Sequence, residues 1–190
     1  MVNIVGKKVT LRSATSADLD ALYFWKYVDE EQAAKQWNGP YIPEKHLTKN
    51  EFLKEWANDD ELFQGIPNTL MMTVNGQFIG VVGAHWVDPN TNWLETGIVT
   101  YPSAYWNGGY GSEAYRLWID YLFQNTPLHR IGMSTWSGNE RMMHVAEKLG
   151  MQLEARIRDA RIVDGKYYDA IKMGILRSEW EKQKLNRNDL

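Results

Sequence analysis

The stretch that decides the fold runs from Tyr101 to Trp118 and reads YPSAYWNGGYGSEAYRLW. It places Gly108, Gly109 and Gly111 directly before a segment with the apolar periodicity of an amphipathic helix. Backbone N–H groups at the start of a helix have no partner inside the helix, and the helix dipole adds partial positive charge there. Because glycine lets an anion approach these amides, the sequence predicts an anion site at this turn. A plain turn into a helix is the open alternative.

The segment Gly109 to Ala114 also matches the G-x-G-x-x-A form of a dinucleotide fingerprint. A dinucleotide fold places that fingerprint after the first strand of a repeated strand–helix–strand set. Here it follows strand-rich segments joined by hairpin signals such as Asn75-Gly76, which indicate an antiparallel meander. This context disfavours a nicotinamide oxidoreductase, which we keep as a third hypothesis.

The flanking segments predict a mixed α/β fold with a mostly antiparallel central sheet and helices on its flanks. Upstream, a strand around Val9 and Leu11 leads into a helix capped by Thr15 or Ser16. A second helix begins at a capping box; its residues are Thr48 and Glu51. Downstream of the glycine turn, a helix, a strand and a second helix lead to two final strands joined at Asp164-Gly165. We expect a single domain over residues 1–180 and a polar tail over 181–190 that frays past Trp180.

Composition excludes several classes of function. The chain has 190 residues, no cysteine and a formal net charge of −3, with a pI near 5.8. The lack of cysteine excludes disulfides, thiolate metal sites and a cysteine nucleophile. The lack of a broad basic field argues against nucleic acid as a partner, and no long apolar run suggests a leader or a membrane span. We therefore expect a cytoplasmic protein with no metal, since the spacing of the four histidines suggests no metal site.

Two motifs of the sequence are considered together. The first is the glycine turn, with a small residue, Glu and Ala after it; its residues are Trp106, Gly109, Gly111, Ser112, Glu113 and Ala114. The second is an asparagine followed by a helix with a characteristic end; its residues are Asn139, Glu147, Lys148, Leu149, Gly150 and Met151. Together they resemble the GNAT superfamily of N-acetyltransferases, and more narrowly the branch that contains the ribosomal-protein N-terminal acetyltransferases. The resemblance runs from about Val9 to Trp180 and implies a GNAT-like acyl-CoA N-acyltransferase fold.

The resemblance also implies acetyl-CoA as the co-substrate. The pyrophosphate would lie on the backbone amides of the glycine turn, from residues Gly109, Tyr110, Gly111 and Ser112. The pantetheine arm would pair with a strand edge, formed by Ile98, Val99 and Thr100. Asn139 would be a further polar contact. Two departures concern the general acid, because Met142 and Ala146 stand where serine or tyrosine is common in the family.

Acetyl transfer to an amine needs a base, and Glu95 is our candidate because it lies on the strand just before the glycine turn, where the family often places such a residue. The alternative is a strand glutamate that faces solvent or pairs with a cation. A thiol is a good leaving group near neutral pH, so the missing acid does not remove the activity. Ser137, Tyr110 and His144 are candidate proton donors, with a structural role as the alternative for each.

By resemblance, two parts of the chain are expected to border the acceptor amine: the segment between the first two helices and the strand that carries Trp86. Trp37 lies in a turn and is our candidate for contact with the acceptor. His85 lies beside Trp86 on the same strand, where the sequence favours a core hydrogen bond over an acceptor contact. The hypothesis is direct attack of a primary amine on acetyl-CoA in a ternary complex, the amine belonging to a small molecule or a protein N-terminus. A non-catalytic acyl-CoA-binding or sensor domain is the alternative, and a homodimer is left open.

Overall fold

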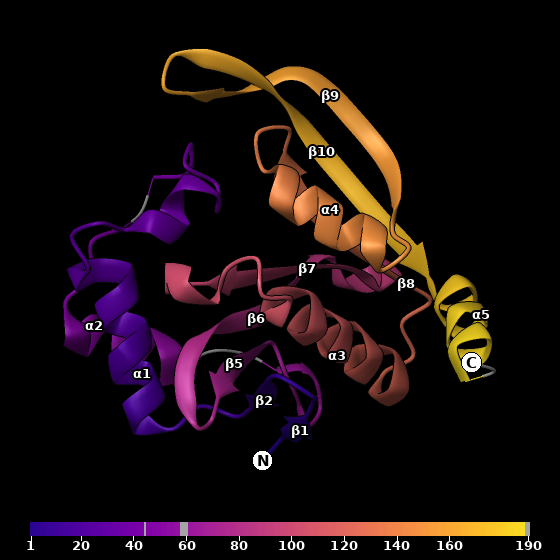
Figure 1. Cartoon of the computed structure of the whole chain (residues 1–190), viewed down its shortest axis with the longest axis horizontal. Helices are drawn as coiled ribbons and strands as arrows, with labels where there is room; N and C mark the ends of the chain where they lie inside the picture. The colour runs from indigo at the N-terminus through magenta and orange to yellow at the C-terminus, as the bar shows by residue number, and fades with distance from the viewer. Residues whose placement is uncertain (44, 58–60, 189–190) are drawn as a thin grey trace. The chain divides into compact units, whose positions relative to one another are not determined.

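The computed structural model describes residues 1–43, 45–57 and 61–188 (Figure 1). The helices are α1 (Ser16–Tyr23), α2 (Lys49–Ala57), α3 (Tyr110–Asn125), α4 (Glu140–Lys148) and α5 (Arg177–Asn188). A π-helix, η1 (Phe24–Val28), and three short 3-10 helices complete them, namely η2 (Ala33–Gln36), η3 (Pro89–Thr91) and η4 (Ser103–Tyr105). The strands are β1 (Asn3–Val5), β2 (Thr10–Arg12), β3 (Glu61–Phe63), β4 (Ile66–Pro67), β5 (Thr69–Val74), β6 (Gln77–Asp88), β7 (Trp93–Thr100), β8 (Arg130–Trp136), β9 (Gln152–Val163) and β10 (Lys166–Leu176).

Eight strands form one sheet in the order β1-β2-β5-β6-β7-β8-β10-β9. Strands β7 and β8 pair in parallel, through Glu95 and Gly132. Antiparallel pairing joins β1 to β2, β2 to β5, β5 to β6, β8 to β10 and β9 to β10. The predicted mixed α/β fold with a mostly antiparallel sheet is confirmed. A dinucleotide fold requires a repeated parallel set, so the nicotinamide hypothesis does not fit this sheet.

The chain divides into two compact units whose boundary runs through β6, β7 and α3. The first unit contains residues 1–83 and 98–118, and the second contains residues 84–97 and 119–190. The expected boundary at residue 180 is not a unit boundary. The single domain over residues 1–180 stays a prediction, and each unit is described by itself.

The first unit is organised around a buried cluster formed by Leu22 of α1, Phe52 of α2, Met71 of β5 and Phe78 of β6. Both helices begin where the sequence predicted. Thr15 caps α1 and its own N–H donates to the Asp18 side chain at 2.8 Å, which completes a capping box. The reciprocal pair at α2 is also present, because the N–H of Thr48 donates to Glu51 at 2.8 Å and the N–H of Glu51 donates to the Thr48 hydroxyl at 3.4 Å.

Both predicted two-residue hairpin turns are confirmed by their backbone angles. Asn75 and Gly76 join β5 to β6 with φ values of 50° and 79°. Asp164 and Gly165 join β9 to β10 with φ values of 48° and 73°. Two consecutive positive φ angles give a turn whose twist matches that of the flanking strands, which is why Asn-Gly and Asp-Gly are favoured there.

The second unit carries the long hairpin of β9 and β10, which Figure 1 shows as an extended, twisted ribbon. The expected fraying after Trp180 is wrong, because α5 continues to Asn188. Asp120 of α3 explains this, since its Oδ1 accepts hydrogen bonds from Trp180 Nε1 at 3.0 Å and from Lys184 Nζ at 2.7 Å. These contacts hold a polar helix that propensity alone would leave marginal.

Arg177 joins the start of α5 to the end of α3. Its guanidinium donates to the backbone carbonyls of Phe123, Thr126 and Leu128 at 2.5, 2.7 and 2.8 Å. The last carbonyls of a helix lack partners within the helix, so this side chain satisfies groups that would otherwise need water. Among residues 1–43, 45–57 and 61–188, no helix is both long and apolar enough to cross a membrane.

Candidate functional site

The glycine turn of the first unit has the backbone that an anion cradle needs. Asn107 and Gly109 have φ values of 60° and 80°, and α3 begins directly afterwards at Tyr110. Helix geometry leaves the N–H groups of Tyr110, Gly111 and Ser112 without carbonyl partners inside α3. The positive end of the α3 dipole therefore coincides with these amides, which favours a bound anion.

Side chains from outside the turn hold it in place. Lys8 Nζ donates to the carbonyl of Gly108 at 2.7 Å, and the Lys8 N–H donates to Glu113 Oε1 at 2.8 Å. Trp106 Nε1 donates to the carbonyl of Thr100 at 2.8 Å, which ties the turn to the end of β7. These contacts give Glu113 and Trp106, both part of the first motif, a positioning role in this structure.

The end of β7 lies beside the glycine turn within the same unit. A Cβ placed on Gly111 would stand 3.7 Å from Ile98 Cδ1 and 3.7 Å from Thr100 Oγ1. That is ordinary contact, so protein packing does not require glycine at this position. A Cβ on Gly80 of β6 would lie 2.1 Å from the carbonyl oxygen of Val99, so β6 approaches β7 closely. The structure thus brings the predicted strand edge, Ile98 to Thr100, together with the predicted cradle.

The donor set fits a phosphate-containing ligand rather than a metal. Within residues 1–43, 45–57 and 61–188, no group of three or more His, Asp or Glu side chains is placed to hold a metal ion. The turn offers backbone N–H groups and the nearby ammonium of Lys8, which bind anions.

Glu95 lies in a polar cluster built from three strands of the second unit. Its side chain is buried, with 5% of the residue exposed. Its Oε2 accepts a hydrogen bond from Ser134 Oγ of β8 at 2.6 Å, and its Oε1 pairs with Lys172 Nζ of β10 at 2.6 Å. Lys172 also donates to Ser134 Oγ at 2.9 Å, which closes the cluster. We call Glu95, Ser134 and Lys172 the carboxylate cluster.

The carboxylate cluster keeps Glu95 ionised. Burial raises the pKa of Glu95. Hydrogen bonds from Lys172 and Ser134, together with the charges of Lys172 and His85, lower this pKa by more than burial raises it, so the net pKa lies below the ordinary value. Of the two alternatives for a strand glutamate, pairing with a cation is the state that the structure shows. The role of Glu95 as a base stays a prediction.

Lys172 also contacts an exposed aromatic ring. Its Nζ lies 5.8 Å from the ring centroid of Trp93, and the guanidinium carbon of Arg130 lies 5.9 Å from the same centroid. Because Trp93 is 38% exposed, its ring and the Lys172 ammonium both reach the surface of the second unit. The carboxylate cluster is therefore accessible from solvent on the side of its lysine.

His85 differs from the sequence expectation. It lies on β6 and is exposed, so the expected core hydrogen bond is wrong. Burial falls along β6, since the buried positions are Phe78 to Gly80 and Val82, and the positions from His85 onward are exposed or half-buried. The charge of His85 acts on Glu95 in the same unit. Trp86 is half-buried beside it, and its contact with an acceptor stays a prediction.

Sequence reasoning missed Ser134 and Lys172. They are separated from Glu95 by 39 and 77 residues, so no local motif connects them. One signal was present: each polar residue follows an apolar stretch of its strand, Ser134 after Ile-Gly-Met in RIGMSTW and Lys172 after Ala-Ile in KYYDAIKMGIL. The pairing of Ser134 with Lys172 in the β8–β10 register then places both polar side chains on one face.

Asn139 has a structural role at the start of α4. It is buried, and its Oδ1 accepts a hydrogen bond from the N–H of Met142 at 3.1 Å, which caps the helix. Ser137 Oγ likewise accepts from the N–H of Asp169 at 3.0 Å. The contact of Asn139 with a co-substrate stays a prediction.

The other candidate residues are spread over the two units. His144 is exposed on α4 in the second unit, and Tyr110 in the first packs edge-on against Tyr105 at 5.3 Å between centroids. Trp37 is half-buried at the end of η2 in the first unit, whereas His85 and Trp86 belong to the second. The contacts of Trp37 with an acceptor stay a prediction.

Comparison with known proteins agrees with both motifs. Residues 8–152 match the family described as the acetyltransferase (GNAT) domain. The chain is 27% identical over 138 residues, 70% of each chain, to a Bacillus subtilis (strain 168) protein named "Putative ribosomal N-acetyltransferase YdaF". It is 25% identical over 182 residues to the uncharacterized N-acetyltransferase p20 of Bacillus licheniformis, with 95% of this chain and 99% of p20 covered.

Solved structures share the fold at low identity. Spermidine N-acetyltransferase from Vibrio cholerae, in complex with CoA and spermine, superposes with a TM-score of 0.74 at 17% identity, covering 93% of this chain and 99% of that one. RimL, a ribosomal L7/L12 alpha-N-protein acetyltransferase in complex with CoA, gives 0.69 at 16% identity, covering 92% and 98%. The match over residues 8–152 includes the glycine turn and the helix that follows Asn139. The chain belongs to the GNAT acetyltransferase family.

Proposed function

We propose that this protein transfers the acetyl group of acetyl-CoA to a primary amine. The observation that carries the proposal is the glycine turn at the start of α3, with its left-handed Gly109 and the adjoining edge of β7, in a GNAT domain. The amides of Gly109 to Ser112 hold the pyrophosphate, and Lys8 adds positive charge near the carbonyl of Gly108. Ile98, Val99 and Thr100 hold the pantetheine arm along the strand edge.

The bond changes define what the residues must do. Acetyl-CoA supplies a thioester whose carbonyl carbon accepts the attacking nitrogen. The C–N bond forms and the carbonyl oxygen becomes an oxyanion; the C–S bond then breaks as the carbonyl re-forms, the thiolate leaves, and the nitrogen loses one proton. A backbone amide near Ile98 stabilises the oxyanion, and Glu95 accepts the proton of the amine, directly or through a water molecule. Since the pKa of Glu95 is held low, its carboxylate is ionised and ready to accept that proton at neutral pH, although it is a weak base.

The acceptor is a primary amine of a small molecule or of a protein N-terminus. The names of relatives support both classes, since YdaF and RimL are named for ribosomal substrates and the Vibrio cholerae enzyme for spermidine. Trp37, His85 and Trp86 are the proposed acceptor contacts. A cytoplasmic location stays a prediction.

Two observations favour a second candidate, the non-catalytic acyl-CoA-binding or sensor domain. Glu95 is already engaged by Lys172 and Ser134, and Met142 stands where the family commonly has serine. A domain of this kind would keep the cradle for the coenzyme and lack turnover.

Thiol release separates the two candidates. The chain has no cysteine, so a thiol reagent reports only the CoA that turnover releases. The purified protein is incubated with acetyl-CoA and with spermidine, free amino acids or peptides with a free N-terminus, and mass spectrometry identifies the acetylated acceptor. The enzyme hypothesis predicts release with at least one amine and a fall in kcat of about 10²-fold or more in Glu95→Gln. CoA binding without turnover on any acceptor would support the sensor instead.

A further inference from the structure

The ammonium group of Lys172 lies among three groups of the second unit that together suit a primary ammonium. Its Nζ pairs with Glu95 Oε1 at 2.6 Å and donates to Ser134 Oγ at 2.9 Å. The ring of Trp93 adds a third contact, since its centroid lies 5.8 Å from Nζ. A carboxylate, a hydroxyl and an aromatic face are groups that attract an ammonium and accept its hydrogen bonds. A residue of the chain itself fills this position.

The strand register holds the carboxylate in place from the side of β8. Glu95 pairs with Gly132 across the parallel β7–β8 pair, and Ser134 follows Gly132 by two residues, so the three positions share one face of the sheet. A Cβ on Gly132 would lie 3.5 Å from Glu95 Cγ. Ser134 Oγ donates to Glu95 Oε2 at 2.6 Å, whereas the ammonium of Lys172 pairs with the other oxygen. Because this bond from Ser134 does not involve the ammonium, the carboxylate keeps an anchor when the ammonium leaves.

The two partners of the ion pair differ in their exposure to solvent. The side chain of Lys172 is 38% exposed, whereas that of Glu95 is 7% exposed. A lysine ammonium is a strongly hydrated point charge on a flexible stem, so it can turn from this position into water. The buried carboxylate would then be left without its cation, which is costly. Replacement of the Lys172 ammonium by another ammonium avoids that cost, because the charge at Glu95 stays balanced.

Other charged groups border the cluster. Arg130 pairs with Glu154 of β9 at 2.5 Å, and its guanidinium carbon lies 5.9 Å from the centroid of Trp93. The charge of His85 on β6 also acts on Glu95. Since the charge of Arg130 is balanced within its own pair, the carboxylate of Glu95 needs a separate cation.

We propose that the carboxylate cluster is a subsite for a primary ammonium group, which Lys172 fills in the free protein and from which the amine of a small ligand displaces it. Glu95 and Ser134 accept the hydrogen bonds of the ligand, Trp93 supplies an aromatic face, and Lys172 acts as an internal competitor. The exchange forms no covalent bond and conserves charge. That the ligand is the acceptor of acetyl transfer rests on the proposed function, whereas the binding of an ammonium does not.

A two-dimensional ¹H–¹⁵N NMR titration of the full chain without acetyl-CoA tests the proposal. The probes are ethylammonium and tetramethylammonium chloride at constant ionic strength. In Lys172→Ala, we expect ethylammonium to give saturable shifts of the Trp93 indole N–H and of the amides at positions 95 and 134. Its affinity should be about tenfold or more above that for the wild type, because the tethered competitor is gone. Tetramethylammonium has no N–H donor and should bind Lys172→Ala about tenfold more weakly than ethylammonium does.

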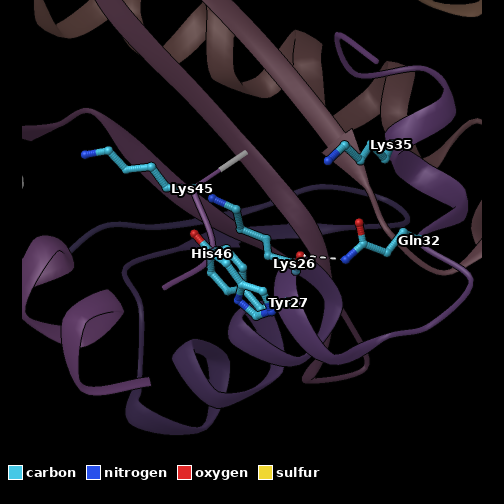
Figure 2. Close-up of a pocket in the computed structure, with 6 residues that line it drawn as sticks. All are labelled: Lys26, Tyr27, Gln32, Lys35, Lys45 and His46. Atoms are coloured by element: carbon cyan, nitrogen blue, oxygen red, sulfur yellow. Dashed lines mark hydrogen bonds between the residues drawn. The ribbon is translucent and has the colours of Figure 1, made fainter. Parts of the chain in front are cut away.

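Two control variants separate this subsite from a general effect of losing a lysine. Lys172→Arg keeps a cation in the subsite and should bind ethylammonium no more tightly than the wild type does. Figure 2 shows Lys26 and Tyr27 among the residues that line a pocket of the first unit. Lys26 Nζ lies 5.3 Å from the Tyr27 ring, so Lys26→Ala also removes an ammonium next to an aromatic ring. This variant should leave the ethylammonium affinity of the carboxylate cluster as it is in the wild type.

The gained affinity should depend on the carboxylate. Glu95→Gln in the Lys172→Ala background should lower it by about tenfold or more, because the charged acceptor is lost. Lys172→Met keeps much of the stem and repeats the test if the shorter side chain prevents folding. The proposal would be overturned if the vacated variant bound ethylammonium no more tightly than the wild type, if Glu95→Gln kept the gain, or if tetramethylammonium bound equally well.

The subsite and the proposed acetyl transfer can fail independently. Ethylammonium binding with the expected dependence on Lys172 and Glu95, but without thiol release on any amine, would support the subsite and count against acetyl transfer. Thiol release in the wild type together with no gain of ammonium affinity in Lys172→Ala would support acetyl transfer and overturn the subsite.

Discussion

The glycine turn and the carboxylate cluster are built in opposite ways. The turn consists of consecutive backbone amides at the start of α3, and its key angle belongs to one residue, Gly109. The cluster consists of side chains from β7, β8 and β10, and the ion pair between Glu95 and Lys172 joins residues 77 positions apart. A site made of backbone depends on conformation, whereas a site made of side chains depends on charge. The two should therefore fail under different substitutions.

The largest expected effect concerns the backbone of the turn. Gly109→Val places a branched side chain at a φ of 80°, and its Cβ would lie 3.3 Å from Lys8 Nζ. We expect a loss of stability of about 1–2 kcal/mol and a loss of coenzyme affinity of more than about tenfold, because the amides can no longer converge. Thermal unfolding with and without CoA measures both effects.

Gly165→Val is the matched control for that substitution. Gly165 has a φ of 73° at the tip of the β9–β10 hairpin, and a Cβ there would meet no atom within 4 Å. It should lose similar stability and keep the full stabilisation by CoA. Equal stabilisation by CoA in Gly109→Val and Gly165→Val would contradict a backbone cradle at the turn.

The next effect concerns charge in the cluster. In the folded state, the pKa of Glu95 lies below its ordinary value of 4.5. The ionised carboxylate therefore stabilises the fold above about pH 4.5, and this stabilisation is lost as the pH falls through the lowered pKa. Lys172→Met leaves a buried carboxylate without its cation and should cost about 1–2 kcal/mol at neutral pH, since Lys172 is partly exposed. The cost should be smaller at acid pH than at neutral pH, because it falls as Glu95 becomes protonated below its lowered pKa.

Urea unfolding at the two pH values measures this difference. Lys172→Arg serves as the control because it keeps the charge and should retain most of the stability. A cost for Lys172→Met that stays constant between neutral and acid pH would show that the lost contribution is packing and not the ion pair.

The smallest effect concerns the hydroxyl of the cluster. Ser134→Ala removes one donor to the carboxylate of Glu95 and should cost about 1 kcal/mol. Because Lys172 also donates to Ser134, the double variant Ser134→Ala/Lys172→Met should differ from the sum of the single variants. Additive free energies of unfolding in this double-mutant cycle would mean that the three side chains do not act as one cluster.

The local features of the fold were predictable from the sequence. The turns at Asn75-Gly76 and Asp164-Gly165, and the capping box of Thr48 and Glu51, depend on residues a few positions apart and match the structure. The order of the main elements from β2 to β10 followed from periodicity in the same way, whereas the short strands β1, β3 and β4 and the helix α5 were not predicted. These signals are readable because their partners are near in sequence.

Long-range contacts account for what the sequence did not predict. The helix after Trp180 depends on Asp120, which lies on a different helix, and the environment of Glu95 depends on Ser134 and Lys172. The exposure of His85 depends on which part of β6 is covered. None of these can be read from a local pattern, because the deciding partner comes from another element of the fold.

The central claim is that the backbone turn holds the coenzyme whereas Glu95 acts on the amine. Isothermal titration calorimetry of acetyl-CoA into the wild type, Gly109→Val and Glu95→Gln tests it most directly. The claim predicts equal affinity for the wild type and Glu95→Gln, and an affinity more than about tenfold weaker for Gly109→Val. The absence of binding to the wild type, or a loss in Glu95→Gln as large as that in Gly109→Val, would contradict it.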